Sequence, residues 1–134
     1  MDRADRTLTL PWPPSVNRIW RALGGRVILS APARDYIKAA GNALPAGRVP
    51  PPLTGRLWVW LTLHPPERTP RGKGPGASWD IANREKIVCD VLTKQRVWVD
   101  DSQIDVLVIQ RGAPRGAGSV DVRIVTIPEG VAPL

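Results

Sequence analysis

Asp80, Lys86 and Asp101 have the residue types and spacing that phosphodiester hydrolysis requires. Carboxylate oxygens are the ligands that Mg²⁺ prefers, and the bound ion polarises a phosphoryl oxygen and activates water. A lysine near such carboxylates neutralises charge on the phosphate or orients the attacking water. If the strand after Asp101 returns beside the start of a helix at Asp80, the three side chains converge on one site.

Both acids also have ordinary structural explanations. Asp is among the favoured N-cap residues of helices, which would explain Asp80, and an Asp-Asp pair is common in turns. His64 has no second His and no Cys cluster to complete a zinc site, so we expect it in a loop. Spacing alone leaves the metal site and the structural roles both open.

Hydrophobic periodicity and turn residues predict the elements that must position these side chains. A first helix is predicted from a Ser30 cap to a stop at Pro45, and a hairpin is predicted about Gly24 and Gly25. The predicted strands cover residues 7–10, 56–63, 103–110 and 120–127. The last two strands are expected to form a hairpin through a long loop at 111–119.

A second helix is predicted from Asp80 to about Gln95. Its packing side is expected to carry Ile81, Val88 and Leu92, and its polar side Asn83, Lys86 and Asp90. The order of elements predicts an α/β (α+β) fold, in which a small mixed β-sheet packs with two helices. We expect one domain over residues 1–134.

The net charge of +7 favours an anionic partner, because clustered cations gain affinity for nucleic acid by releasing counterions. A long basic loop expected at 64–78 carries Arg68, Arg71 and Lys73, and Trp12 and Trp20 are expected to be exposed enough to stack on bases. The lone Cys89 cannot form an internal disulfide, and the sequence has neither a signal region nor a run long enough to span a membrane. We therefore expect a soluble, cytoplasmic protein with no membrane partner.

Three segments resemble a known family. "LTLPWPPSVNRIWR" is similar to an N-terminal strand and proline-rich entry, and "ILSAPARDYI" to a first helix. The most specific match is "DIANREKIVCDVLTKQRVWVDDSQI". The family has an Asp-x-Asp-Asn motif, a Lys shortly after it, an Asp-x-Leu segment, and then a hydrophobic residue and Asp-Asp with a Gln close behind. The matching residues here are Asp80, Asn83, Lys86, Asp90, Leu92, Trp98, Asp100, Asp101 and Gln103. The chain thus resembles the RusA-like Holliday junction resolvases of bacteria and their phages.

The resemblance implies a homodimeric, Mg²⁺-dependent endonuclease of a bacterial or phage-infected cell, with Mn²⁺ as a substitute. It implies paired symmetric nicks in four-way DNA junctions, whose two-fold symmetry a two-fold dimer matches. By position Asp80 and Asp101 are implied metal ligands, Lys86 is the catalytic cation, and Asp100 is a neighbour that orients the site, supported by Asn83 and Asp90. Phosphate contacts are expected from Asn17, Arg18, Arg68, Arg71, Lys73, Arg111 and Arg115.

Ala82 departs from the family pattern, because it replaces the second acid of the motif and offers no oxygen to a metal. At about 100° per residue, Glu85 would lie about 60° round the helix from position 82, and almost one turn further along, so we expect it to be a poor substitute. The enzyme is therefore expected to be catalytically impaired, by an engineered or a natural change. Trp79 replaces a basic residue common in relatives, which would move nearby phosphate contacts to Arg71 or Lys73.

Two other functions stay open at this point. A junction-binding protein without nuclease activity would have an architectural or regulatory role on DNA, and a small basic domain would alternatively bind RNA. The homodimer is favoured independently by Trp58 and Trp60, because their apolar surface exceeds what one small sheet and two helices cover.

Overall fold

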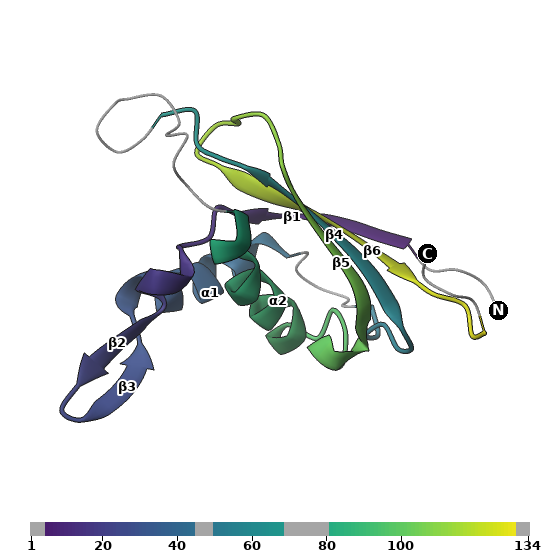
Figure 1. The fold of residues 1–134 in the computed structure, drawn as a ribbon, viewed down its shortest axis with the longest axis horizontal. Helices are drawn as coiled ribbons and strands as arrows, with labels where there is room; N and C mark the ends of the chain where they lie inside the picture. The colour runs from purple at the N-terminus through teal and green to yellow at the C-terminus, as the bar shows by residue number, and fades with distance from the viewer. Residues whose placement is uncertain (1–4, 45–49, 69–80, 131–134) are drawn as a thin grey trace.

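The computed structural model shows a four-stranded mixed sheet with two helices on one of its faces (Figure 1). The structure describes residues 5–44, 50–68 and 81–130. In the strand order β1-β6-β4-β5, β4 runs parallel to β5 and antiparallel to β6. The strands are β1 (Asp5–Pro11), β4 (Leu57–His64), β5 (Ile104–Arg111) and β6 (Ser119–Thr126). The predicted fold class is confirmed.

Central strand β4 divides the sheet into a buried and an open face. Its odd-numbered residues, Leu57 to Leu63, are buried beneath the helices, as the two-residue period of a strand requires. Each such side chain stabilises the fold by roughly 2 kcal/mol relative to exposure. Trp58 and Trp60 point to the open face, where their ring centroids lie 5.0 Å apart.

Helix α1 (Ala31–Ala43) begins where the sequence predicts. The Ser30 hydroxyl accepts a hydrogen bond from the Ala33 amide at 3.2 Å, which caps the first turn. Tyr36 attaches the helix to β1, because its hydroxyl donates to the Pro11 carbonyl at 2.9 Å. Burial raises the pKa of this phenol, so it remains a donor at neutral pH.

The predicted hairpin is confirmed as β2 (Trp20–Leu23) and β3 (Arg26–Leu29), and it projects away from the sheet (Figure 1). Gly24 and Gly25 have φ of 55° and 77°, the left-handed values that a tight hairpin turn needs. Trp20 is 57% exposed, as expected. None of the described helices has the length and apolar character needed to cross a membrane.

The second helix begins later than the sequence predicts. Residues Ile81–Asn83 form a short 3-10 turn, η2, and α2 covers only Glu85–Lys94. Between them Arg84 leaves the helical region, with φ −127° and ψ −12°. The expected angular separation of positions 82 and 85 is therefore wrong, because it assumes one continuous helix.

Tertiary contacts of Arg84 explain the break. Its guanidinium donates to the carbonyl of Pro13 and lies over the ring of Trp12, 4.8 Å from the centroid. These contacts with the proline-rich entry outweigh the weak local preference for helix. The packing side of α2 is as predicted at Val88 and Leu92, which are buried, whereas Ile81 lies before the helix.

The expected hairpin between the last two strands is wrong. Strand β4 lies between β5 and β6, so the connecting loop crosses the end of β4 instead of turning back beside β5. The Gly112 amide donates to the Leu63 carbonyl at 2.8 Å, and the Arg115 amide donates to the Pro65 carbonyl at 2.9 Å. His64, expected in a loop, is the last residue of β4.

Candidate active site

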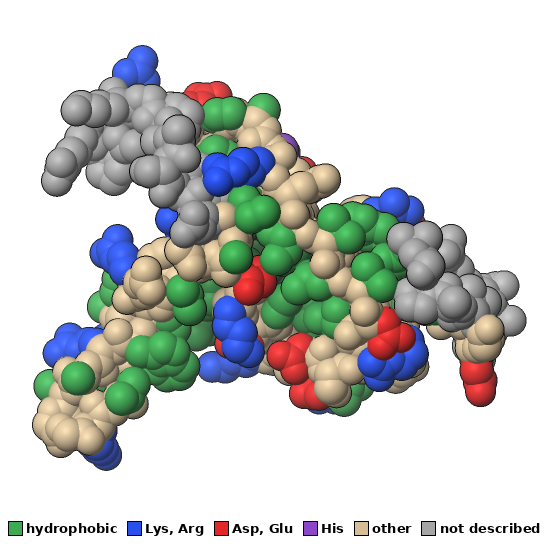
Figure 2. Space-filling view, viewed as in Figure 1, with side chains coloured by type: hydrophobic (Ala, Val, Ile, Leu, Met, Phe, Trp, Pro, Cys, Tyr) green, Lys and Arg blue, Asp and Glu red, His purple; other side chains and the backbone are tan. Residues whose placement is uncertain are grey.

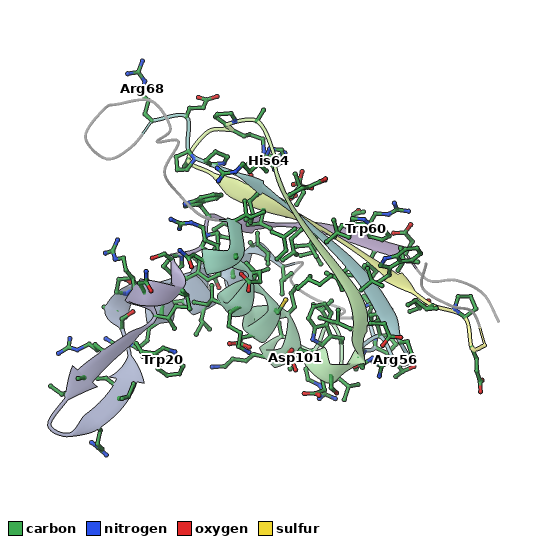
Figure 3. The ribbon with its side chains drawn as sticks, viewed as in Figure 1. Trp20, Arg56, Trp60, His64, Arg68 and Asp101 are labelled. Atoms are coloured by element: carbon green, nitrogen blue, oxygen red, sulfur yellow. The ribbon has the colours of Figure 1, made fainter. Side chains whose placement is uncertain are left out.

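A groove of about 330 Å³ lies between α2 and the start of β5. Its lining residues are Glu85, Lys86, Cys89, Asp101, Ile104, Asp105 and Leu107. Acidic and basic side chains gather over this part of the surface (Figure 2), and Asp101 lies at the end of β5 nearest α2 (Figure 3). Two of the three predicted catalytic residues, Lys86 and Asp101, thus share one groove, whereas Asp80 lies outside the described residues.

Lys86 connects the helix with the turn before β5. Its Nζ lies 2.9 Å from Asp90 Oδ1, one turn along the helix, and 3.8 Å from Asp101 Oδ2. The hydrogen bond to Asp90 raises the pKa of Lys86, so the amine is protonated at neutral pH. Lys86 is therefore suited to neutralise a phosphate and not to accept a proton.

The turn that carries Asp101 is η3 (Asp101–Gln103), and a capping box holds it. The Asp100 carboxylate accepts from the Ser102 amide at 3.1 Å, while Gln103 Oε1 accepts from the Asp100 amide at 2.9 Å. The Ser102 bond also lowers the pKa of Asp100. Gln103 Nε2 then donates to backbone carbonyls before β4, which positions the turn on the sheet.

Asp105, a further acid in the groove, is already neutralised. Its carboxylate forms an ion pair with Arg56, whose guanidinium also donates to the Ser102 carbonyl at 2.9 Å. The bond from Arg56 lowers the pKa of Asp105. Asp105 is therefore engaged in holding the η3 turn.

Glu85 is the acid that sequence reasoning dismissed. It is the first residue of α2 and lines the groove, and its Oε2 is buried without a hydrogen-bond partner. A buried carboxylate oxygen in this state costs free energy unless a hydrogen-bond donor, a water molecule or a cation approaches it. No local signal in the sequence indicates this position, because it depends on the helix break at Arg84.

Cys89 shows how acidic the groove is. Burial raises the pKa of its thiol to about 12, and the negative charges of Asp90, Glu85 and Asp101 add to the rise. The thiol is therefore neutral, so it is not a thiolate ligand at physiological pH.

The oxygen atoms of the groove fit a hard divalent cation. Among the described residues, no three His, Cys, Asp or Glu side chains are grouped closely enough to hold a metal ion. Mg²⁺ nevertheless needs only one or two carboxylates, because water and substrate phosphates complete its shell. Asp101 and Glu85 offer such oxygens, and the Oε2 atom of Glu85 has no hydrogen-bond partner among the described residues. Ala82, exposed in η2, offers none.

Arg84 and Arg18 form a basic pair near the N-terminus of α2. Arg18 ends the short turn η1 (Val16–Arg18), which also contains the predicted DNA contact Asn17. Burial, and then the positive charge of Arg18, lowers the pKa of Arg84, whose Nε is buried without a partner. Two neighbouring guanidinium groups of this kind favour an anion such as a phosphate. Sequence reasoning predicted Arg18 and missed Arg84.

The other predicted DNA contacts do not lie at the groove. Arg111 ends β5, roughly 23 Å along the strand from its start beside Asp101, and Arg68 lies beyond the same far end (Figure 3). Arg115 donates to the Asp121 carboxylate at 2.7 Å and to the Ser119 hydroxyl, so its charge is engaged within the sheet. Arg71 and Lys73 lie outside the described residues.

A second groove, of about 620 Å³, lies on the open face of the sheet. Among the described residues that line it, the one acid is Asp121, which is already bonded to Arg115 and Thr9, and none is a lysine. This larger groove lacks the free carboxylate and ammonium that a hydrolytic site needs. The smaller groove is therefore the better candidate.

Comparison with known proteins agrees with the motif at this groove. The family model described as "Endodeoxyribonuclease RusA" matches residues 11–125. The chain is 31% identical to the crossover junction endodeoxyribonuclease RusA of Escherichia coli strain K12 over 122 residues, 91% of this chain and 82% of that protein. It is also 31% identical to the corresponding protein of Enterobacteria phage 82 over 121 residues, covering 90% of this chain and 82% of the phage protein. The chain belongs to the RusA family of endodeoxyribonucleases.

Proposed function

We propose that this chain is a Mg²⁺-dependent endonuclease that resolves four-way DNA junctions by paired symmetric nicks. The observation that carries the proposal is the approach of Lys86 Nζ to Asp101 Oδ2, 3.8 Å apart in a groove of oxygen ligands. The name of the relatives, crossover junction endodeoxyribonuclease, supports the choice of substrate.

Asp101 and Lys86 of the groove, and the residues that support them, have proposed roles in cleavage. A divalent cation bound there would polarise the scissile phosphoryl group and lower the pKa of the attacking water, with Mn²⁺ able to replace Mg²⁺. Asp101 would hold the cation together with Asp80. Protonated Lys86, oriented by Asp90, would neutralise charge on the phosphate in the transition state. Asp100 and Asn83 would support the two segments that carry the ligands.

DNA binding is proposed to begin at the basic pair beside the groove. Arg18 and Arg84 would contact a phosphate of the cleaved strand, with Asn17 next to them. The cations Arg68, Arg71, Lys73, Arg111 and Arg115 would follow the arms of the junction. Because Arg115 is paired with Asp121, we expect its contribution to be the smallest of these.

Ala82 is proposed to slow cleavage without preventing junction binding. A missing acidic ligand removes a coordination position and a negative charge from the site. Ala82→Asp should raise the rate up to about a thousandfold, because a transition-state contact worth about 4 kcal/mol corresponds to that factor.

The test is cleavage of a labelled four-way junction with Mg²⁺, or with EDTA as the control. The given chain should cut very slowly, Ala82→Asp should cut rapidly, and Ala82→Asp combined with Asp101→Asn should not cut. Competition with equal-length duplex and folded RNA checks the substrate class. If Ala82→Asp binds junctions tightly without cutting them, the chain is a non-catalytic junction-binding protein, and if RNA competes best, the junction proposal fails.

A further inference from the structure

The groove contains an acid whose charge has no counter-ion. Asp101 has Lys86 at 3.8 Å, Asp105 has Arg56, and Asp90 has Lys86 at 2.9 Å. Within the part of the chain that the structure describes, Glu85 has no ion pair, and its buried Oε2 has no hydrogen bond. A buried carboxylate oxygen without a partner costs free energy, and a cation at Glu85 would offset this cost.

The helix break makes Glu85 the first residue of α2. Because Arg84 leaves the helical conformation, α2 begins at Glu85, and both Glu85 and Lys86 line the groove. Position 82 lies in a separate 3-10 turn, where the alanine is exposed. Of these two positions, only Glu85 lines the groove.

We propose that Glu85 supplies the second acid of the metal site, in place of the carboxylate that Ala82 cannot provide. This inference rests on the proposed metal-dependent cleavage. The slow cleavage expected of the chain is then carried by a cation to which Glu85 adds a carboxylate beside Asp101 and the other ligand proposed above, with the remaining ligands from water and phosphate. Glu85 becomes dispensable once an acid returns to position 82.

The affinity of the protein for Mn²⁺ tests this proposal independently of catalysis. Mn²⁺ is titrated into the chain without DNA and followed by its electron paramagnetic resonance signal or by calorimetry. Glu85→Gln should weaken Mn²⁺ binding at least about tenfold, since even residues that only support metal ligands affect affinity to that extent. Glu129→Gln, an exposed position in the C-terminal turn, is the matched control and should bind as the parent does.

Thermal unfolding separates a lost ligand from a damaged fold. Without metal, Glu85→Gln should unfold at the same temperature as the parent or a higher one, because it removes a buried uncompensated charge. Mn²⁺ should raise the unfolding temperature of the parent more than that of Glu85→Gln, since a ligand stabilises the state that binds it. Equal Mn²⁺ affinity and an equal shift in both proteins would overturn the proposal.

Junction cleavage then tests the exchange of roles between the two positions. Glu85→Gln should abolish the slow cutting of the parent, but it should change the rate of Ala82→Asp less than threefold. If Ala82→Asp cuts and Glu85→Gln leaves the rate and the Mn²⁺ affinity of the parent unchanged, the inference fails while the nuclease proposal stands. If no variant cuts junctions but Glu85→Gln still weakens Mn²⁺ binding, the nuclease proposal fails and the metal ligand stands.

Discussion

At the scale of single residues, Arg84 is held in an unusual environment. Its guanidinium lies over Trp12, donates to the Pro13 carbonyl and keeps its Nε buried and unpartnered. The like charge of Arg18 nearby destabilises this arrangement when no anion is present. A DNA phosphate beside the two guanidinium groups would relieve this repulsion.

We therefore expect Arg84→Met to weaken junction binding roughly tenfold, the value of one hydrogen bond to a charged group. The slope of log affinity against log salt should fall by about 0.9, because one phosphate contact is lost. Arg6→Met is the control, since Arg6 also donates to a backbone carbonyl, that of Pro51, but sits at the other end of β1. Equal effects of both substitutions in a filter-binding series would show that only net charge matters.

At the scale of elements, Asp121 of β6 connects three parts of the open sheet face. It accepts from Thr9 of β1 at 3.0 Å and from Arg115 of the crossing loop at 2.7 Å, and His64 of β4 lies 3.2 Å away. The bond from Arg115 is the largest cause that lowers the pKa of Asp121. The ionised side chain thus joins both neighbours of β6 and the loop that crosses the end of β4.

The depressed pKa makes this connection sensitive to acid. Its stabilisation is present above the unfolded pKa, near pH 4, and is lost as the pH falls through the lower pKa of the folded state. Asp121→Asn should lower the free energy of unfolding by about 1 kcal/mol at pH 7 and by much less near pH 2. Urea denaturation at both pH values measures it, with Asp35→Asn on the exposed side of α1 as control. An equal loss at both pH values would indicate lost packing instead of lost charge.

At the scale of the whole molecule, the helices cover one face of the sheet and leave Trp58 and Trp60 on the other. Arg123 lies 5.2 Å from the centroid of the Trp60 ring, which leaves this face a mixture of apolar and charged groups. The projecting hairpin is a second apolar surface, on which the side chains of Leu23 and Val27 are 53% and 70% exposed. Either surface offers a second copy of the chain an apolar contact.

We expect a dimer formed through the sheet face, because Trp58 and Trp60 lie side by side there and neither is fully buried. Light scattering at micromolar concentration should give twice the chain mass. Trp60→Glu should shift the mass toward the monomer, whereas Val27→Glu on the hairpin should not. A monomeric Val27→Glu with a dimeric Trp60→Glu would assign the interface to the hairpin, and a monomeric parent would contradict paired cleavage.

Local patterns in the sequence predicted the strands, because a strand shows a period of two in its side chains. They also predicted the hairpin turn at Gly24 and Gly25 and the Ser30 cap, because each of these depends on neighbouring residues. The motif also predicted that Lys86 and Asp101 share a site. Only the tertiary structure decided that β4 separates β5 from β6, since strand order depends on pairings distant in the chain. It likewise decided where α2 begins: Arg84 binds Pro13 and Trp12, residues 71 and 72 positions earlier, and no local pattern records that contact. The role proposed for Glu85 follows from that one long-range contact.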